Sequence, residues 1–330
     1  MISSVRTTLV RLPRTLRLCL TEARPLVQAV FVLRYLTGGL AALTGEVSTL
    51  PNLLLGALAW WAATVAIYLY NGLSDLPEDL VNGSRRPLAS GRLAAPAARV
   101  VTLALAALAP ALAAGAAPAL VPCVFGYLAL GFWYSAPRGA AKRRGWSATL
   151  STTAAALLSY VGGCLAGGGA LTTTALAVGG VMSLWVGLIG AVTKDLGSTA
   201  GDARAGRRTL AVTRGENAAR RFSAVCALAL SAIAVVGSAA LAGLPAQVSG
   251  IVPPPEATGI CAPYFSTILA AKIALLAGAC VLSIGSLKVA QSCFHPIESR
   301  PRAPYRAGMA TQYAVHLVVA LALACGFVGV

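Results

Sequence analysis

Charged residues are scarce in this sequence: they make up 11% of its 330 residues, and only ten are Asp or Glu. Soluble globular domains carry about a quarter charged residues, so this scarcity excludes an ordinary water-soluble domain. Hydrophobic residues reach 57% although aromatic residues are only 6%, which leaves Ala, Leu and Val to form the apolar surface. With 34 glycines, this composition is typical of closely packed transmembrane helices.

Two other features are missing. The eight cysteines include no Cys-x-x-Cys pair, so neither a zinc site nor a disulfide framework is indicated. Residues 1–24 contain five arginines but no compact apolar core before a cleavage site, which excludes a cleavable signal peptide. We interpret 1–24 as a basic segment on the cytoplasmic membrane surface.

The net charge of +16 is a value that nucleic-acid-binding proteins also reach. In this chain, however, the Lys and Arg residues other than Arg34 and Lys272 lie in loops between long apolar runs and at their ends, and they form no continuous basic face. This distribution is the positive-inside pattern of membrane proteins. We therefore expect the lipid bilayer as a partner and no nucleic acid.

Nine apolar runs have about the 20 residues that a membrane-spanning helix needs. They lie at 25–44, 52–71, 97–114, 117–135, 147–166, 173–193, 219–242, 265–287 and 309–328. The longest segment between them has about 25 residues, so no second domain fits. The sequence predicts an all-α polytopic membrane protein of about nine helices, with one domain over 1–330.

The connecting segments alternate in charge along the chain. Those on one side contain no Lys or Arg (45–51, 111–118, 166–172, 243–264), whereas those on the other side are strongly basic. Because basic loops remain in the cytoplasm, we predict a cytoplasmic N-terminus and an outside C-terminus. The expected location is the cell membrane.

Five of the ten acidic residues gather in two loops on the basic side, after the second and sixth runs. In the first loop, Asn71, Asp75 and Asp79 share one face if the helix continues. Carboxylate and amide oxygens are the ligands that Mg²⁺ prefers, together with phosphates of a substrate. Arg86 follows shortly after, and arginine matches phosphate oxygens in a bidentate manner.

The second loop repeats this chemistry. Lys194, Asp195 and Asp202 lie among further basic residues on the same predicted membrane face. Between the two acidic loops, Tyr134 and Arg138 lead into Lys142, a segment that also suits an aromatic anchor at the membrane interface. Two acidic clusters flanked by cations can hold metal ions and bridge a diphosphate.

These loops resemble the UbiA superfamily of membrane prenyltransferases. Asn71, Asp75, Asp79 and the run Arg86-Pro87-Leu88-Ala89-Ser90-Gly91 fall in register with its motifs N-D-x-x-D-x-x-x-D and R-P-[LI]-x-S-G. The second motif is matched by Lys194, Asp195, Gly201, Asp202, Gly206 and Thr209-Leu210. Tyr134-Ser135-Ala136-Pro137, Lys142 and Gly145-Trp146 match a connection of the chlorophyll-synthase-like members.

The resemblance implies nine helices around a central chamber and Mg²⁺-dependent ionisation of an isoprenyl diphosphate, whose prenyl group passes to a lipophilic or aromatic acceptor. The metal ligands and catalytic carboxylates are then Asp75, Asp79, Asp195 and Asp202, with Asn71 as a further ligand. The residues expected to bind the diphosphate are Arg86, Arg138, Lys142 and Lys194.

Two positions depart from the family pattern. Gly72 stands where the family usually has the first Asp, and Ser198 replaces the middle Asp of the second motif. These departures put the transfer step in doubt and leave open a terpene cyclase, in which a double bond of the substrate captures the cation. A third interpretation is a non-enzymatic transporter or scaffold.

One arginine lies inside an apolar run. Arg34 is near the middle of 25–44, and charges within a membrane usually face a cavity or a partner. We expect Arg34 to line the chamber with Tyr134, facing a polar acceptor, or else to form a structural pair.

Overall fold

The computed structural model describes residues 13–43, 49–81, 83–244, 261–294 and 301–328. These residues form helices, turns and one isolated bridge between Arg144 and Arg208, with no strand among them. The predicted all-α class is confirmed.

Among the described residues, eight helical segments are long and apolar enough to cross a membrane. They are α2 (Pro25–Ala42), α3 (Thr49–Val81), α4 (Ala95–Ala116), α6 (Gly145–Gly167), the segment Thr173–Thr193, α11 (Glu216–Gly243), α13 (Cys261–Phe294) and α14 (Ala303–Val328). The segment Thr173–Thr193 consists of α7 (Thr173–Trp185), a π-helical turn (Val186–Gly190) and α8 (Ala191–Thr193). A further helix, α5 (Leu120–Ser135), has 16 residues, fewer than a perpendicular crossing needs.

The apolar stretch 97–135 is divided as predicted. Pro110 lies inside α4 and does not end it. The helix ends instead at Ala116: the next residue, Ala117, has an extended backbone, because the residue before a proline is disfavoured in the helical region. Each of the nine predicted runs therefore contains a helix.

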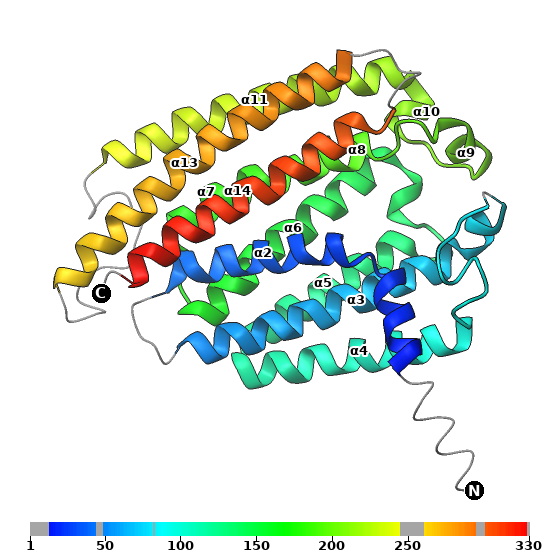
Figure 1. Cartoon of the computed structure of the whole chain (residues 1–330), viewed down its shortest axis with the longest axis horizontal. Helices are drawn as coiled ribbons and strands as arrows, with labels where there is room; N and C mark the ends of the chain where they lie inside the picture. Colours follow the sequence, from blue (N-terminus) through cyan, green and yellow to red (C-terminus); the bar gives the residue numbers. More distant parts are fainter. Residues whose placement is uncertain (1–12, 44–48, 82, 245–260, 295–300, 329–330) are drawn as a thin grey trace, which may run out of the picture.

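The long helices run side by side (Figure 1), with α11, α13 and α14 on one side of the bundle and α3 and α4 on the other. Each side has its own apolar core. Trp185 and Leu282 belong to the first core, and Trp60 and Leu120 to the second.

The two sides meet where α2 packs against α6. A side chain at Gly163 would begin 1.9 Å from the carbonyl oxygen of Tyr35, and one at Gly38 would begin 2.3 Å from that of Tyr160. Glycine lets the two backbones approach closely, which is a usual basis of helix packing in membranes. This contact fixes α2, and with it Arg34, in the middle of the bundle.

One end of the bundle gathers the short elements. A helix over 13–22, α9 (Thr199–Arg204) and α10 (Leu210–Arg214) lie at the end where α3 finishes, and α14 finishes at the opposite end (Figure 1). Of the predicted basic segment 1–24, residues 1–12 lie outside the described part, as does 245–260 in the predicted outer loop. The assignment of the cytoplasmic side stays a prediction.

Candidate active site

The first acidic motif lies on a continuous helix. α3 extends to Val81, ten residues beyond the predicted end of the span, and Pro77 lies within it without ending it. Asn71, Asp75 and Asp79 are therefore spaced four residues apart along one helical face. The Asn71 amide nitrogen donates a hydrogen bond to Ser135 Oγ at 2.7 Å, which leaves the amide oxygen of Asn71 available as a ligand.

Arg207 joins the two acidic loops. Its guanidinium lies 3.6 Å from Asp75 Oδ1 and 3.3 Å from Asp202 Oδ1, and it also pairs with Glu78. Burial opposes the charge on this guanidinium, but Glu78, Asp75 and Asp202 outweigh burial and raise the pKa of Arg207. Motifs separated by more than 120 residues thus meet at a single cation.

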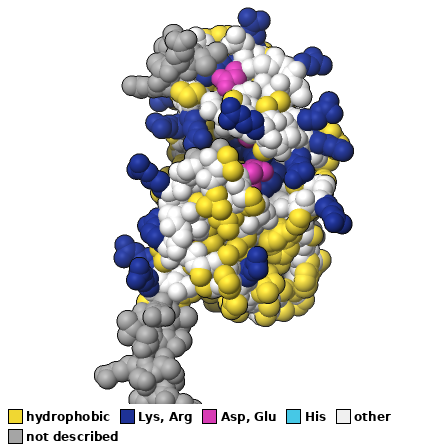
Figure 2. Space-filling view, turned by 90° about the vertical axis from the view of Figure 1, so that its right-hand side faces the viewer, with side chains coloured by type: hydrophobic (Ala, Val, Ile, Leu, Met, Phe, Trp, Pro, Cys, Tyr) yellow, Lys and Arg dark blue, Asp and Glu magenta, His cyan; other side chains and the backbone are white. Residues whose placement is uncertain are grey.

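Two more cations complete the cluster. Lys142, from a short 3₁₀ turn (Ala141–Arg143), pairs with Asp75. Arg86 pairs with Asp79 at 3.0 Å. Figure 2 shows the end of the molecule, where the acidic side chains in view lie among Lys and Arg. Over the described ranges, no three Asp, Glu, His or Cys side chains are arranged around a metal-sized position; Asp75, Asp79 and Asp202 each pair with Lys or Arg.

Asp195 lies close enough to Asp202 and Arg207 to be affected by their charges, but it forms no ion pair with this cluster among the described residues. It lines a second cavity of about 940 Å³ whose wall also includes Arg144, Thr149 and Arg208. Its carboxylate has no ion pair within the described part of the chain, and burial raises the pKa of Asp195, an effect only partly offset by Lys194. Ser198 instead accompanies Asp202, with its hydroxyl donating to Asp202 Oδ2 at 2.9 Å.

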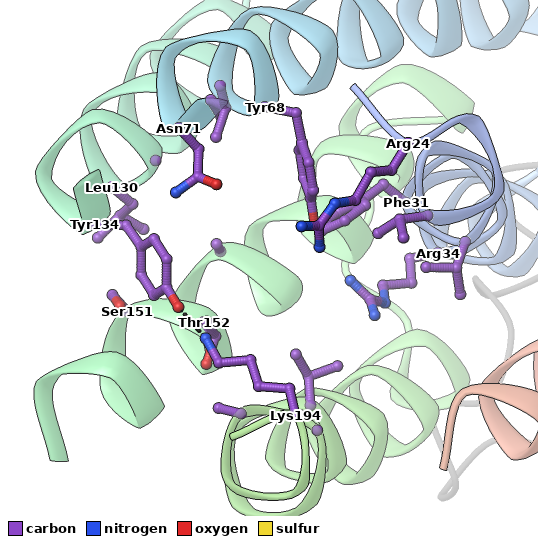
Figure 3. Close-up of a pocket in the computed structure, with 18 of the residues that line it drawn as sticks. Arg24, Phe31, Arg34, Tyr68, Asn71, Leu130, Tyr134, Ser151, Thr152 and Lys194 are labelled. Atoms are coloured by element: carbon purple, nitrogen blue, oxygen red, sulfur yellow. Dashed lines mark hydrogen bonds between the residues drawn. The ribbon is translucent and has the colours of Figure 1, made fainter. Parts of the chain in front are cut away.

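A chamber of about 210 Å³ is lined in part by Asn71 and Lys194 from the two acidic motifs, both labelled in Figure 3. Its walls come from α2, α3, α5, α6, the α7–α8 segment and α14, and are mainly apolar and aromatic. Phe31, Tyr68 and Tyr127 contribute rings, and Asn71 lines the chamber too. Asn71 is therefore shared: it belongs to the chamber wall and begins the row of ligands that continues with Asp75.

Arg34 lies on the opposite side of the chamber from Tyr134 (Figure 3). It is 2% exposed and donates to Gln312 Oε1, with its guanidinium 4.6 Å from the centre of the Phe31 ring. Its Nε and Nη1 have no hydrogen-bond partner among the described residues. Behind Gln312, His316 bonds to Tyr160. Arg34 is thus a buried cation with unused donors and no carboxylate partner within the described ranges.

The remaining predicted cations separate into two groups. Lys194 lines the chamber, bonds to the Tyr134 hydroxyl and lies 4.9 Å from the centre of its ring. Arg138 is exposed on the turn after α5. Lys194 therefore faces the chamber, whereas Arg138 forms no hydrogen bond or ion pair with the carboxylate cluster in the described part of the structure.

The sequence was compared with known families and structures. Residues 31–255, about two thirds of the chain, match the UbiA prenyltransferase family. The chain belongs to that family. A comparison with curated proteins finds no match.

Solved structures of UbiA proteins share the fold. A UbiA homolog from Archaeoglobus fulgidus, bound to GPP and Mg²⁺, has a TM-score of 0.68 at 19% identity, covering 94% of this chain and 98% of its own. The apo structure of a UbiA homolog from Aeropyrum pernix K1 has a TM-score of 0.60 at 18% identity, covering 91% and 96%.

The sequence did not identify four residues of this UbiA protein as parts of the site: Glu22, Arg24, Arg207 and Gln312. Arg24 lines the chamber from the turn before α2, with a positive φ of 58°. The sequence did indicate that Arg24 lies outside a helix, because Pro25 follows it and the residue before a proline avoids the helical region. Glu22 also stood out, as the one acid within 1–24. Nothing in the sequence distinguished Arg207 from the other basic residues around it.

Proposed function

We propose that this UbiA-family protein is a Mg²⁺-dependent membrane prenyltransferase. It ionises an isoprenyl diphosphate at the cluster joined by Arg207 and transfers the prenyl group, within the chamber, to a lipophilic or aromatic acceptor. The reaction takes place at the cytoplasmic end of the bundle in the cell membrane.

One observation carries this proposal. Asn71 lines the apolar chamber, and one helical turn further along α3, Asp75 contacts Lys142 and Arg207. A substrate with an apolar tail and a diphosphate head fits that boundary, with its tail among aromatic rings and its head among cations. Related UbiA structures have been solved with GPP or DMAPP together with Mg²⁺.

The donor set suits magnesium. Asn71, Asp75 and Asp79 from α3 and Asp202 from the second loop supply only oxygen atoms, the ligand type that Mg²⁺ prefers. Asp75 and Asp202 already reach a common cation, Arg207. These four residues are the proposed ligands; Asp195, which the sequence also suggested, would need to turn away from the second cavity. Bound Mg²⁺ supplies charge stabilisation for the leaving diphosphate.

The protein's own residues then act as follows. As the C–O bond breaks, its electron pair leaves with the diphosphate, and Arg86, Lys142 and Arg207 stabilise the negative charge. The allylic cation faces the rings of Phe31 and Tyr127, whose π faces attract positive charge, in a chamber that excludes water. A nucleophilic carbon or oxygen of the acceptor captures the cation and then loses its proton.

Arg34 favours an acceptor over an acceptor-free reaction. An allylic cation formed near an unpaired guanidinium is repelled by it. An acceptor that carries an anionic or strongly hydrogen-bonding oxygen would bind the free donors of Arg34 and remove that repulsion. The aromatic walls would also suit a terpene cyclase, so the acceptor-free reaction is the experiment that separates the two.

Arg34→Met is expected to weaken acceptor use about tenfold or more in KM, while prenyl diphosphate binding changes little. Thermal stability should be unchanged or higher, because a buried charge without a counter-ion is costly. Both quantities are measurable in detergent. Lys272→Met is the control, since Lys272 is a cation in another helix that bonds to the carbonyl of Leu244. Equal effects from both substitutions would contradict a role for Arg34.

The proposed function is tested by incubating purified protein with Mg²⁺ and geranyl, farnesyl or geranylgeranyl diphosphate, first without any acceptor. We expect binding that EDTA abolishes and little product, followed by prenylated product once an aromatic acid or another lipophilic acceptor is added. A cyclic hydrocarbon or alcohol formed without an acceptor would instead establish the cyclase. Absence of Mg²⁺-dependent binding would contradict both reactions.

A further inference from the structure

Glu22 is a fully buried carboxylate at the end of the helix 13–22, with a side chain 0% exposed. Its Oε1 pairs with Arg86 Nη2 at 2.6 Å, and its Oε2 accepts a hydrogen bond from the backbone N–H of Leu88 at 3.0 Å. The backbone carbonyl of Glu22 accepts a further bond from Arg86 at 3.3 Å. Glu22, from the N-terminal segment, thus binds both the Arg86 side chain and the Leu88 backbone in the loop after α3.

Gly72 makes room for this carboxylate. A Cβ at position 72 would lie 2.6 Å from Glu22 Oε1, 3.1 Å from Arg86 Nη2 and 3.2 Å from Leu88 Cδ1. Glycine inside a helix is less stable than alanine there, and Gly72 lies well inside α3. The helix accepts that cost at a position where a Cβ would collide with Glu22.

Packing holds the backbone on both sides of Glu22 in place. Cys19 and Ala23 are buried on either side of it, in the same apolar cluster as Leu69 and Leu88. Cys19 and Ala23 are therefore packed against the end of α3 and the loop that carries Arg86. Packing fixes the backbone of Glu22, and the ion pair fixes its side chain.

We propose that Glu22 is a positioning residue for Arg86, and that it supplies from the N-terminal helix the carboxylate that the UbiA motif carries on α3 at position 72. Glu22 and Asp79 hold the guanidinium from two directions, so that Arg86 meets the diphosphate in one orientation. The role of Glu22 in substrate binding rests on the proposed function. The exchange, in which position 22 rather than position 72 supplies the carboxylate, does not.

The physical reason is preorganisation. A flexible arginine loses side-chain entropy when it binds a phosphate, and the loss is smaller if the protein has already fixed the side chain. A neutral residue at position 22 would leave Arg86 with the backbone carbonyl of that residue and the carboxylate of Asp79, and Asp79 is itself a proposed metal ligand. Glu22 therefore frees Asp79 to turn towards Mg²⁺ without releasing Arg86.

The exchange is tested by a double-mutant cycle with Glu22→Ala and Gly72→Asp. Each single variant is expected to melt at a lower temperature than wild type, the first because it leaves Arg86 without its buried partner and the second because of the clash. The double variant should melt closer to wild type than either single one, since Asp at position 72 then reaches Arg86. Additive losses in the double variant would overturn the exchange.

Substrate binding gives a second readout, which a purely structural role would not move. Glu22→Gln keeps the size of the side chain and should raise KM for the prenyl diphosphate about tenfold, with kcat within about twofold, because a charged partner is lost. In Glu22→Ala, Gly72→Asp should restore KM to within about threefold of wild type. Thr21→Ala is the matched control: among the described residues the Thr21 hydroxyl hydrogen-bonds only to the Arg17 carbonyl, and KM should not change.

The two proposals fail in different ways. If wild type shows no Mg²⁺-dependent binding, the proposed function is wrong, and the melting temperatures still decide the exchange. If wild type binds but Glu22→Gln has an unchanged KM, Glu22 does not position Arg86.

Discussion

Replacing Asp75 or Asp202 by Ala is expected to lower Mg²⁺-dependent turnover of a prenyl diphosphate by about a thousandfold or more. Each variant removes a carboxylate from the place where the two loops meet, and a thousandfold corresponds to about 4 kcal/mol of lost transition-state stabilisation. The measurement is release of diphosphate under saturating Mg²⁺, with acceptor present. Near-normal turnover in either variant would exclude a site formed by both loops.

Asp195→Ala is the informative companion, because Asp195 has the same charge and lies in the same motif. Its carboxylate lines the second cavity and has no ion pair in the described part of the protein. We therefore expect a loss at least tenfold smaller than that of Asp202→Ala. Equal losses would mean that Asp195 turns into the site when metal and substrate bind.

Arg207→Gln is expected to make the substrate-free protein bind divalent cations about tenfold more tightly. In the structure Arg207 is the cation between Asp75, Glu78 and Asp202. Without it, the three carboxylates repel one another and attract any other cation more strongly. A tenfold change corresponds to about 1.4 kcal/mol. The measurement is Mn²⁺ binding, by electron paramagnetic resonance, in the absence of diphosphate.

The same variant should bind prenyl diphosphate more weakly, because one cation near the leaving group is gone, and it should melt at a lower temperature without metal. Arg204→Gln is the control: it makes the same charge change in the same loop, at an exposed residue. If Arg204→Gln raised Mn²⁺ affinity equally, the effect would be one of overall charge. An unchanged affinity in Arg207→Gln would show that Arg207 does not compete with the metal.

Part of the site followed from sequence alone, and the reason is that it is local. Asn71, Asp75 and Asp79 share a face because a helix repeats every 3.6 residues, so only its continuation to Val81 had to be established. Family membership was also predicted, since three motifs in order are a property of the sequence itself, and the match to the UbiA family confirms it.

Other parts could not be predicted, because they depend on how distant helices are turned towards one another. Asp195 and Asp202 are close in the chain, but the turn between Thr193 and α9 directs Asp195 to the second cavity and Asp202 to Arg207. For Arg34 the sequence left a place at the chamber wall and a structural pair open; in the structure Arg34 lies at the chamber wall and also bonds to Gln312. Its partner Gln312, 278 residues away, carried no signal beyond being polar in an apolar run.

The sequence by itself determined the membrane environment, the helices and the family. The length of apolar runs, the charge of loops and the order of motifs are properties of consecutive residues and do not depend on packing. Only the tertiary structure decided which charges meet: Arg207 with the acids of both loops, and Glu22 with Arg86 in the space left by Gly72. An ion pair requires atoms to approach within about 4 Å. That proximity depends on the packing and rotation of helices far apart in sequence.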